Sequence, residues 1–197
     1  MIPSTAFSEI LLELEARPIP VNVYRKKVGE GRSQAFGLVN RRCLPADYSR
    51  QCWLRPKLFG HLLAFGAEHV RDISWNAITV NQNYCAGPHR DKHNIGSSFL
   101  VAFGDYSEGG ALNILEGDLS GSHDIRYQPV ITDFSKVLHS VSSWKSGDRY
   151  SLVFYLLNTG VVLPPPSVKE IDGKLTFFRG DVACRGLPHP LKGRKKL

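Results

Sequence analysis

The sequence has few cysteines and no long apolar run, and both absences narrow what the chain can be. Cys43, Cys52, Cys85 and Cys184 are widely spaced and form no Cys-x-x-Cys pair. Neither a zinc knuckle nor a redox-active dithiol is therefore indicated, and we expect reduced thiols. No stretch approaches the roughly 18 to 20 apolar residues of a membrane span, and no basic region followed by an apolar segment opens the chain. The sequence predicts an intracellular protein with no membrane partner.

Composition predicts one folded unit with an excess of positive charge. A length of 197 residues and a hydrophobic content of 42% fit a single domain that buries its own core, which we expect to be monomeric. The net charge of +7 favours a polyanionic partner such as nucleic acid. Part of this excess lies in the tail Lys192–Lys196, which is equally compatible with a solvated chain end.

Apolar spacing predicts helices in the first third of the chain. Apolar residues recur at helical intervals over Ser4–Ala16, and mixed intervals of three and four recur over Tyr48–Val70. Pro56 either breaks this second helix or opens another one. Two short apolar runs, Val21–Tyr24 and Ala35–Val39, suggest a leading strand pair.

From Trp75 onward, short apolar runs alternate with turns rich in Gly and Asp. We therefore predict an α+β protein whose core is a jelly roll, or double-stranded β-helix, with the N-terminal helices packed on one sheet. Within the single domain 1–197 we assign 1–72 to support, 73–160 to the core and 161–197 to a C-terminal extension with a basic tail. The expected strands are 77–84, 97–103, 111–115, 125–131, 136–138, 150–157 and, after three prolines, 175–178.

Two histidines and an aspartate form a candidate metal site. His89 and Asp91 are two residues apart, so in an extended segment they lie on one face and can bind one ion together. His139 lies in an apolar run fifty residues later, where a neighbouring strand could deliver the third ligand. Two imidazoles and one carboxylate leave three open octahedral positions, an arrangement suited to iron(II), 2-oxoglutarate and oxygen.

Arg149 opens a strongly apolar strand ten residues after His139. A guanidinium directed into a small barrel requires an anionic partner, and the distal carboxylate of 2-oxoglutarate would supply it. Ser151 lies on the same strand face and could donate a further hydrogen bond. We also assign Asn83, on the strand before the His-x-Asp motif, to co-substrate binding.

Other interpretations of these residues remain open. A lone His-x-Asp also occurs in ordinary turns, and His123 is a rival third ligand, although it lies in a turn-like stretch with no Arg ten residues on. His61 and His69 fall in the second helical region and fit packing or surface roles there.

The motif segments resemble the TET/JBP family of iron and 2-oxoglutarate oxygenases, which hydroxylate the methyl group of 5-methylcytosine or thymine in DNA. Residues 85–94, Cys-Ala-Gly-Pro-His-Arg-Asp-Lys-His-Asn, are similar to the family's metal-binding segment, and Gly96-Ser97 follows as it does there. Residues 149–155, Arg-Tyr-Ser-Leu-Val-Phe-Tyr, are similar to the family's strand R-x-S-L-V-F-Y. The resemblance covers about 75–160, and its compact spacing is closer to small protist and algal members.

The resemblance implies roles beyond the metal and co-substrate. Asn94 matches a position that hydrogen-bonds the flipped base, and Tyr155 matches the aromatic residue on which that base stacks. His93 lies in the same segment and is assigned to the substrate as well. The cofactors implied are Fe(II), 2-oxoglutarate and O2, with ascorbate as an assistant or an unusual replacement for 2-oxoglutarate. A DNA substrate would place a eukaryotic protein in the nucleus.

One position departs from the family pattern. Where the family has a base-contacting His two residues past the aromatic residue, this chain has Leu157. An apolar side chain cannot replace that contact, so a different base, RNA, or a protein or small-molecule substrate becomes an alternative. A catalytically silent binding module is a third alternative, but the residues expected to bind iron and co-substrate are all present.

Overall fold

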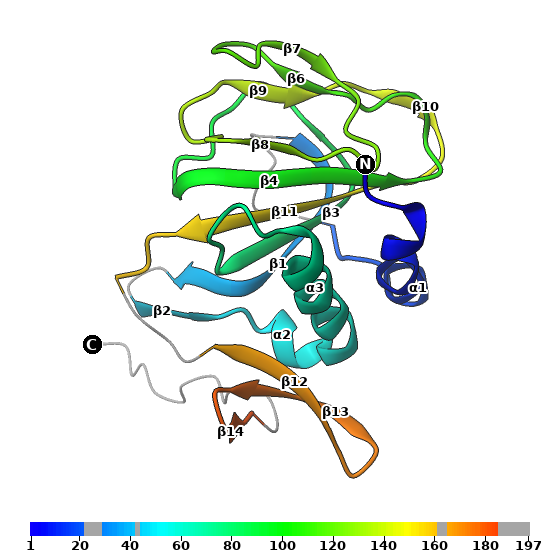
Figure 1. Ribbon diagram of the computed structural model, residues 1–197. Coiled ribbons are helices and arrows are strands. Elements are labelled where there is room, and N and C mark those ends of the chain that lie inside the picture. The colour runs from blue at the N-terminus through cyan, green and yellow to red at the C-terminus, as the bar shows by residue number, and fades with distance from the viewer. Residues whose placement is uncertain (22–28, 42–43, 161–164, 185–197) are drawn as a thin grey trace, which may run out of the picture.

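The computed structural model describes residues 1–21, 29–41, 44–160 and 165–184. Two layers of antiparallel β-sheet face each other, and helices cover the outer face of the larger layer (Figure 1). This is the predicted jelly-roll core with N-terminal helices packed on one sheet. A small third sheet, formed by the C-terminal strands, lies beyond these helices.

The larger sheet has the strand order β2-β1-β3-β11-β4-β8. On its central strand β11, Tyr150, Leu152 and Phe154 pack under the helices, whereas Ser151 and Val153 point into the space between the layers. This alternation follows from the two-residue period of a strand. The bounds are β1 Gly29–Arg41, β2 Leu44–Tyr48, β3 Ala77–Ala86, β4 Asn94–Gly104, β8 Val130–Thr132 and β11 Arg149–Leu157.

The helices bury their apolar faces against this sheet. A 3-10 turn (Ser4–Phe7) leads into α1 (Ser8–Ala16), and α2 (Gln51–Leu54) is followed by α3 (Pro56–His69). Pro56 stands in the first turn of α3, where its missing N–H has no helical partner to lose. The prediction that this proline separates two helices is therefore confirmed.

The smaller layer and the C-terminal sheet consist of short strands. In the smaller layer, β6 (Leu112–Ile114) lies between β7 (Gly121–His123) and β9 (His139–Val141), and β5 (Ser107–Gly109) pairs with β10 (Trp144–Ser146). The C-terminal sheet packs on the helices through Phe177, whose ring contacts those of Tyr48, Trp53 and Phe59. Its strands are β12 Pro166–Ile171, β13 Lys174–Arg179 and β14 Val182–Ala183.

Two predicted strands are wrong in their bounds. The run 125–131 is a strand only from Val130, because Tyr127 takes a positive φ of 59° that an extended strand does not allow. The run 136–138 is not a strand, because 134–136 form a turn in which Asp133 accepts hydrogen bonds from the backbone N–H groups of Ser135 and Lys136; the strand begins at His139. Most of Val21–Tyr24 and all of the tail Lys192–Lys196 lie outside the described residues.

None of the helices in the described ranges is long and apolar enough to cross a membrane. Cys52, Cys85 and Cys184 are free thiols, and Cys43 lies outside the described residues.

We expect Phe154→Ala to lower the free energy of unfolding by about 3–5 kcal/mol, because a fully buried ring would leave a cavity. Phe154 is 0% exposed and packs against Phe65, Trp75 and Phe99. Urea denaturation followed by circular dichroism measures the loss, with the half-exposed Leu175→Ala as control. A loss no larger than that of the control would contradict this account of the core.

Candidate active site

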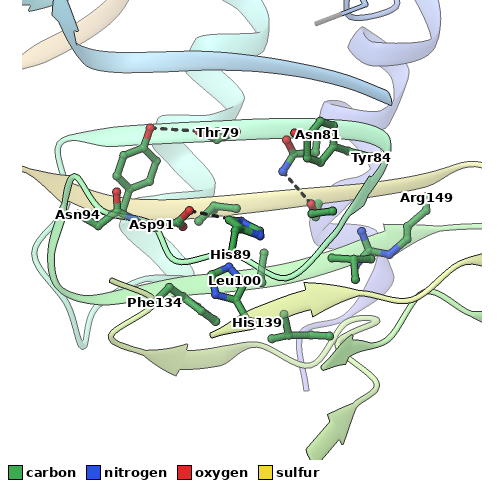
Figure 2. Close-up of a pocket in the computed structure, with 16 residues that line it drawn as sticks. Thr79, Asn81, Tyr84, His89, Asp91, Asn94, Leu100, Phe134, His139 and Arg149 are labelled. Atoms are coloured by element: carbon green, nitrogen blue, oxygen red, sulfur yellow. Dashed lines mark hydrogen bonds and ion pairs between the residues drawn. The ribbon is translucent and has the colours of Figure 1, made fainter. Parts of the chain in front are cut away.

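Three side chains from opposite layers meet in one cluster. His89 and Asp91 lie in the segment between β3 and β4, and His139 opens β9 on the facing sheet (Figure 2). One ligand atom of each residue lies within 4.8 Å of the others, and His89 Nε2 is 3.6 Å from Asp91 Oδ1. The predicted triad is therefore assembled, and it is the only such group of His, Cys, Asp and Glu among the described residues.

Backbone hydrogen bonds hold the two ligand-bearing segments together. The N–H of His89 donates to the carbonyl of His139 over 2.9 Å, and the N–H of His139 donates back over 3.0 Å. The N–H of Asp91 donates to the carbonyl of Phe134 over 2.9 Å. These backbone hydrogen bonds form a short antiparallel ladder, which fixes the distance between the His89–Asp91 segment and His139.

Each imidazole is oriented by a backbone carbonyl. His89 Nδ1 lies 2.8 Å from the carbonyl oxygen of Gly87, and His139 Nδ1 lies 3.1 Å from that of Val137. Because these nitrogens must donate to the carbonyls, Nε2 of each ring keeps its lone pair for a metal. Burial lowers the pKa of His139, which favours the neutral form that ligates.

The donor set fits iron(II). Two neutral imidazoles and one carboxylate on one side of an ion leave three octahedral positions open, enough for a bidentate 2-oxo acid and oxygen. The side chain of His89 is 19% exposed and that of Asp91 is 20% exposed, so the cluster can be reached from outside.

Arg149 places a positive charge at the other end of the same cavity. The residue is 2% exposed, and its Nε donates to the carbonyl of Gly110 over 2.9 Å. Its Nη2 is buried and has no hydrogen-bond partner. Burial lowers the pKa of the guanidinium, yet an Arg remains charged, and a buried unpaired donor is costly. The arrangement calls for an anion, and a carboxylate fits it.

The cavity of about 110 Å³ joins Arg149 to the triad. Asn81 and Ser151 line its wall, and the amide of Asn81 donates to the hydroxyl of Ser151 over 3.2 Å. Figure 2 shows both ends of the cavity in one view. A short dianion could therefore contact the metal position and the guanidinium at once.

Asn83, which the sequence analysis assigns to co-substrate binding, lies outside the lining of the cavity. Its positive φ of 50° interrupts the alternation of β3, so that Asn81 and Tyr84 line the cavity and Asn83 does not. The Asn83 amide donates to the carboxylate of Asp148, and its oxygen accepts from the N–H of Arg149 over 2.8 Å. Asn83 therefore holds the start of β11 and positions the backbone of Arg149 without lining the cavity itself.

The residues assigned to the substrate lie at an outer groove of about 710 Å³. Tyr155 and Asn94 line both the inner cavity and this groove, whereas the exposed His93 lines the groove alone. The Tyr155 hydroxyl is 3.1 Å from Thr79 Oγ1. The Asn94 amide reaches Asp91 Oδ2 over 3.4 Å and Ser98 Oγ over 3.3 Å, so it also supports the metal carboxylate.

Sequence reasoning missed Thr79, Asn81 and Tyr84. Thr79 and Asn81 are polar residues that alternate with the buried Ile78 and Val80, and this period of two could have placed them beside Ser151. Tyr84 lies past the irregular Asn83, where the alternation no longer predicts the inner face.

We expect Asp91→Ala to weaken divalent metal binding at least about 100-fold, because it removes the only anionic ligand. Cobalt(II), with its visible absorption, serves as the probe in a titration. Asp118→Ala, which removes an exposed carboxylate from a turn, is the matched control. Equal affinity of the two variants would rule out the triad as the metal site.

Solved structures of similar fold identify the fold of this chain. No protein-family model and no curated protein matches the chain. NgTET1, solved in complex with 5mC DNA, matches with a TM-score of 0.56 at 15% identity over 80% of this chain and 70% of that chain. An oxidoreductase of the 2OG-Fe(II) oxygenase family from Burkholderia pseudomallei matches with a TM-score of 0.51 at 17% identity over 79% of this chain and 81% of that chain. The chain therefore has the jelly-roll fold of 2OG-Fe(II) oxygenases, with a His-x-Asp…His cluster in its cavity.

Proposed function

We propose that the protein is an Fe(II)- and 2-oxoglutarate-dependent dioxygenase that oxidises the methyl group of a modified nucleobase, 5-methylcytosine or thymine, in DNA. One observation carries the enzyme class: a single cavity holds the His89, Asp91 and His139 cluster at one end and the buried, unpaired Nη2 of Arg149 at the other. The fold likeness to 2OG-Fe(II) oxygenases supports the same class.

The chain's residues divide the chemistry between them. When bound, iron(II) with 2-oxoglutarate and oxygen supplies the oxidation that replaces a C–H hydrogen with hydroxyl, while 2-oxoglutarate becomes succinate and carbon dioxide. His89, Asp91 and His139 would hold the metal. Arg149 would bind the distal carboxylate, with Ser151 beside it, and so fix the opposite end of the co-substrate towards the metal.

Four features support a nucleobase substrate. Tyr155 stands between the inner cavity and the outer groove, where a flipped base could stack on its ring. Lys92 and His93 line the groove and suit a phosphate backbone. NgTET1, a structure of similar fold, was solved with 5mC DNA. The positive net charge is in keeping with such a partner.

A protein or small-molecule hydroxylase is the second candidate. The observation that favours it is Leu157, which lines the outer groove together with Val39 and Leu138. This apolar wall offers no hydrogen bond to the edge of a cytosine. Thymine, whose methyl group packs on apolar surfaces, and non-nucleic substrates tolerate such a wall better.

Incubation with DNA containing 5-methylcytosine, iron(II) and 2-oxoglutarate tests the proposal. We expect nucleoside mass spectrometry to show an oxidised base, with the Asp91→Ala protein as the negative control. Unmethylated DNA in a parallel sample reports thymine oxidation. Unchanged bases together with robust succinate formation would reject the nucleobase substrate and leave the oxygenase class standing.

We expect Tyr155→Ala to spare succinate formation from 2-oxoglutarate but to lower substrate oxidation about tenfold or more, the worth of one stacked base. The Tyr155→Phe control keeps the ring and loses the hydroxyl that contacts Thr79, so it should retain most product. Succinate and oxidised base are measured in the same reaction. Equal loss of both in Tyr155→Ala would make the residue structural.

We expect Asn83→Ala to weaken 2-oxoglutarate binding about tenfold, since the N–H of Arg149 loses a hydrogen-bond acceptor and the strand start loosens. Cobalt(II) affinity should not change, because Asn83 touches no metal ligand. Calorimetric titration of 2-oxoglutarate into the cobalt-loaded protein measures the effect, with the exposed Asn158→Ala as control. Unaltered 2-oxoglutarate affinity would show that Asn83 does not act on co-substrate binding through Arg149.

A further inference from the structure

Arg90 stands between the two metal ligands of the His-x-Asp segment and has a defined set of partners. Its Nε and Nη2 donate to Glu116 Oε1 over 3.0 and 2.5 Å, and Nη2 also reaches Oε2 over 2.7 Å. Because neighbouring residues of an extended segment face opposite ways, Arg90 points away from the metal position when His89 and Asp91 point towards it.

Glu116 connects Arg90 to the residue that precedes His139, the third member of the triad. Its Oε1 accepts the N–H of Leu138 over 2.5 Å, and Arg90 Nε also donates to the carbonyl of Lys136 over 3.0 Å. Leu138 directly precedes His139. The N–H of Leu115, next to Glu116, donates to the carbonyl of Leu138 over 2.8 Å, which extends the β6–β9 ladder to this point.

We propose that Arg90 and Glu116 are positioning residues that fix the separation between the His89-x-Asp91 segment and His139, and thereby the affinity of the metal site. The inference rests on the proposed function insofar as the triad binds a metal. It assigns a role to the residue between the ligands, which neither contacts the metal position nor lines the inner cavity.

Exposure indicates that the pair contributes to geometry more than to stability. The side chains of Arg90 and Glu116 are 42% and 38% exposed, and exposed ion pairs stabilise proteins little because water and salt screen them. The geometry is nevertheless well defined, since one carboxylate oxygen receives both a guanidinium and a backbone N–H. The pKa of Glu116 lies below its usual value because of the Leu138 hydrogen bond and the Arg90 hydrogen bonds, so the acceptor is a carboxylate at neutral pH.

A simple ion pair and a positioning clamp differ in their response to charge reversal. In the double variant R90E/E116R the two side chains can still pair. With a guanidinium at position 116, however, the N–H of Leu138 has no acceptor, and with a carboxylate at position 90 the carbonyl of Lys136 has no donor. A clamp is therefore not restored by the reversal, whereas an ion pair acting through charge alone would be.

Cobalt(II) titration of the full chain, with absorption and affinity as readouts, tests the proposal. We expect Glu116→Ala and Arg90→Ala, which remove the acceptor of the Leu138 N–H and the donor to the Lys136 carbonyl, each to weaken cobalt binding about tenfold, the lower end of what loss of an outer hydrogen-bond partner costs a metal site. The visible spectrum of the bound ion should change, and R90E/E116R should bind as weakly as the single variants. The melting temperature of the metal-free protein should shift by less than about 4 °C. Glu108→Ala, which removes the exposed ion pair with Lys145, is the matched control and should bind like the wild type.

The outcomes separate this inference from the function on which it rests. Wild-type affinity and spectrum in Glu116→Ala and Arg90→Ala would overturn the clamp and leave the metal site intact. Recovery of affinity in R90E/E116R, or a loss of affinity that tracks a large fall in melting temperature, would overturn it as well. Failure of the wild type itself to bind cobalt would remove both the clamp and the proposed oxygenase.

Discussion

The reciprocal backbone hydrogen bonds between His89 and His139 are the contact on which the site depends. These hydrogen bonds join the segment between β3 and β4 of the larger sheet to the first residue of β9 in the smaller sheet. The two layers therefore meet at the triad. Without this ladder, His89 and Asp91 could still share a face, but the third ligand would have no fixed distance to them. The jelly roll supplies this closure because its two sheets face each other across a narrow interior.

Arg149 imposes the second constraint. A buried guanidinium lowers stability unless its donors are satisfied, and the fold satisfies only part of them, through the carbonyl of Gly110. The backbone of β11 is held at that point by Asn83, whose own backbone has a positive φ. Partial pairing and local strain thus occur together at one end of the cavity. This is expected where a chain keeps a binding group available for a ligand at some cost in stability.

Sequence reasoning reached the parts of this protein that depend on local pattern. Local spacing alone predicts the shared face of His89 and Asp91, the apolar strand β11 and the helix within 4–16. His139 is predicted next to His89 and Asp91 because a barrel with a neighbouring strand is expected at this position. The fold brings the three residues together. The predicted bounds of β9 are wrong because Asp133 forms a local turn with Ser135 and Lys136. Those of β8 are wrong because Tyr127, which is hydrogen-bonded to Ala102 and Ile2, has a positive φ. Asn83 lies outside the cavity because one irregular residue moves the later side chains of its strand to the other face.

The residues proposed for the reaction line the inner cavity, whereas most of those proposed to select the substrate line the outer groove. The inner cavity is polar at both ends, where the cluster of His89, Asp91 and His139 and the guanidinium of Arg149 limit which molecules can lie between them. The outer groove is built from the loop after β3, from β1, from Leu138 and from the last residues of β11, and most of its side chains lie outside the triad and the inner cavity. Leu157, which pairs in register with Asn94 across β11 and β4, belongs to this outer set. Under the proposed function, a change there would alter which molecule reaches the metal position without disturbing the hydrogen bonds between His89 and His139. A resemblance that is strong at the triad can for this reason stop at the substrate.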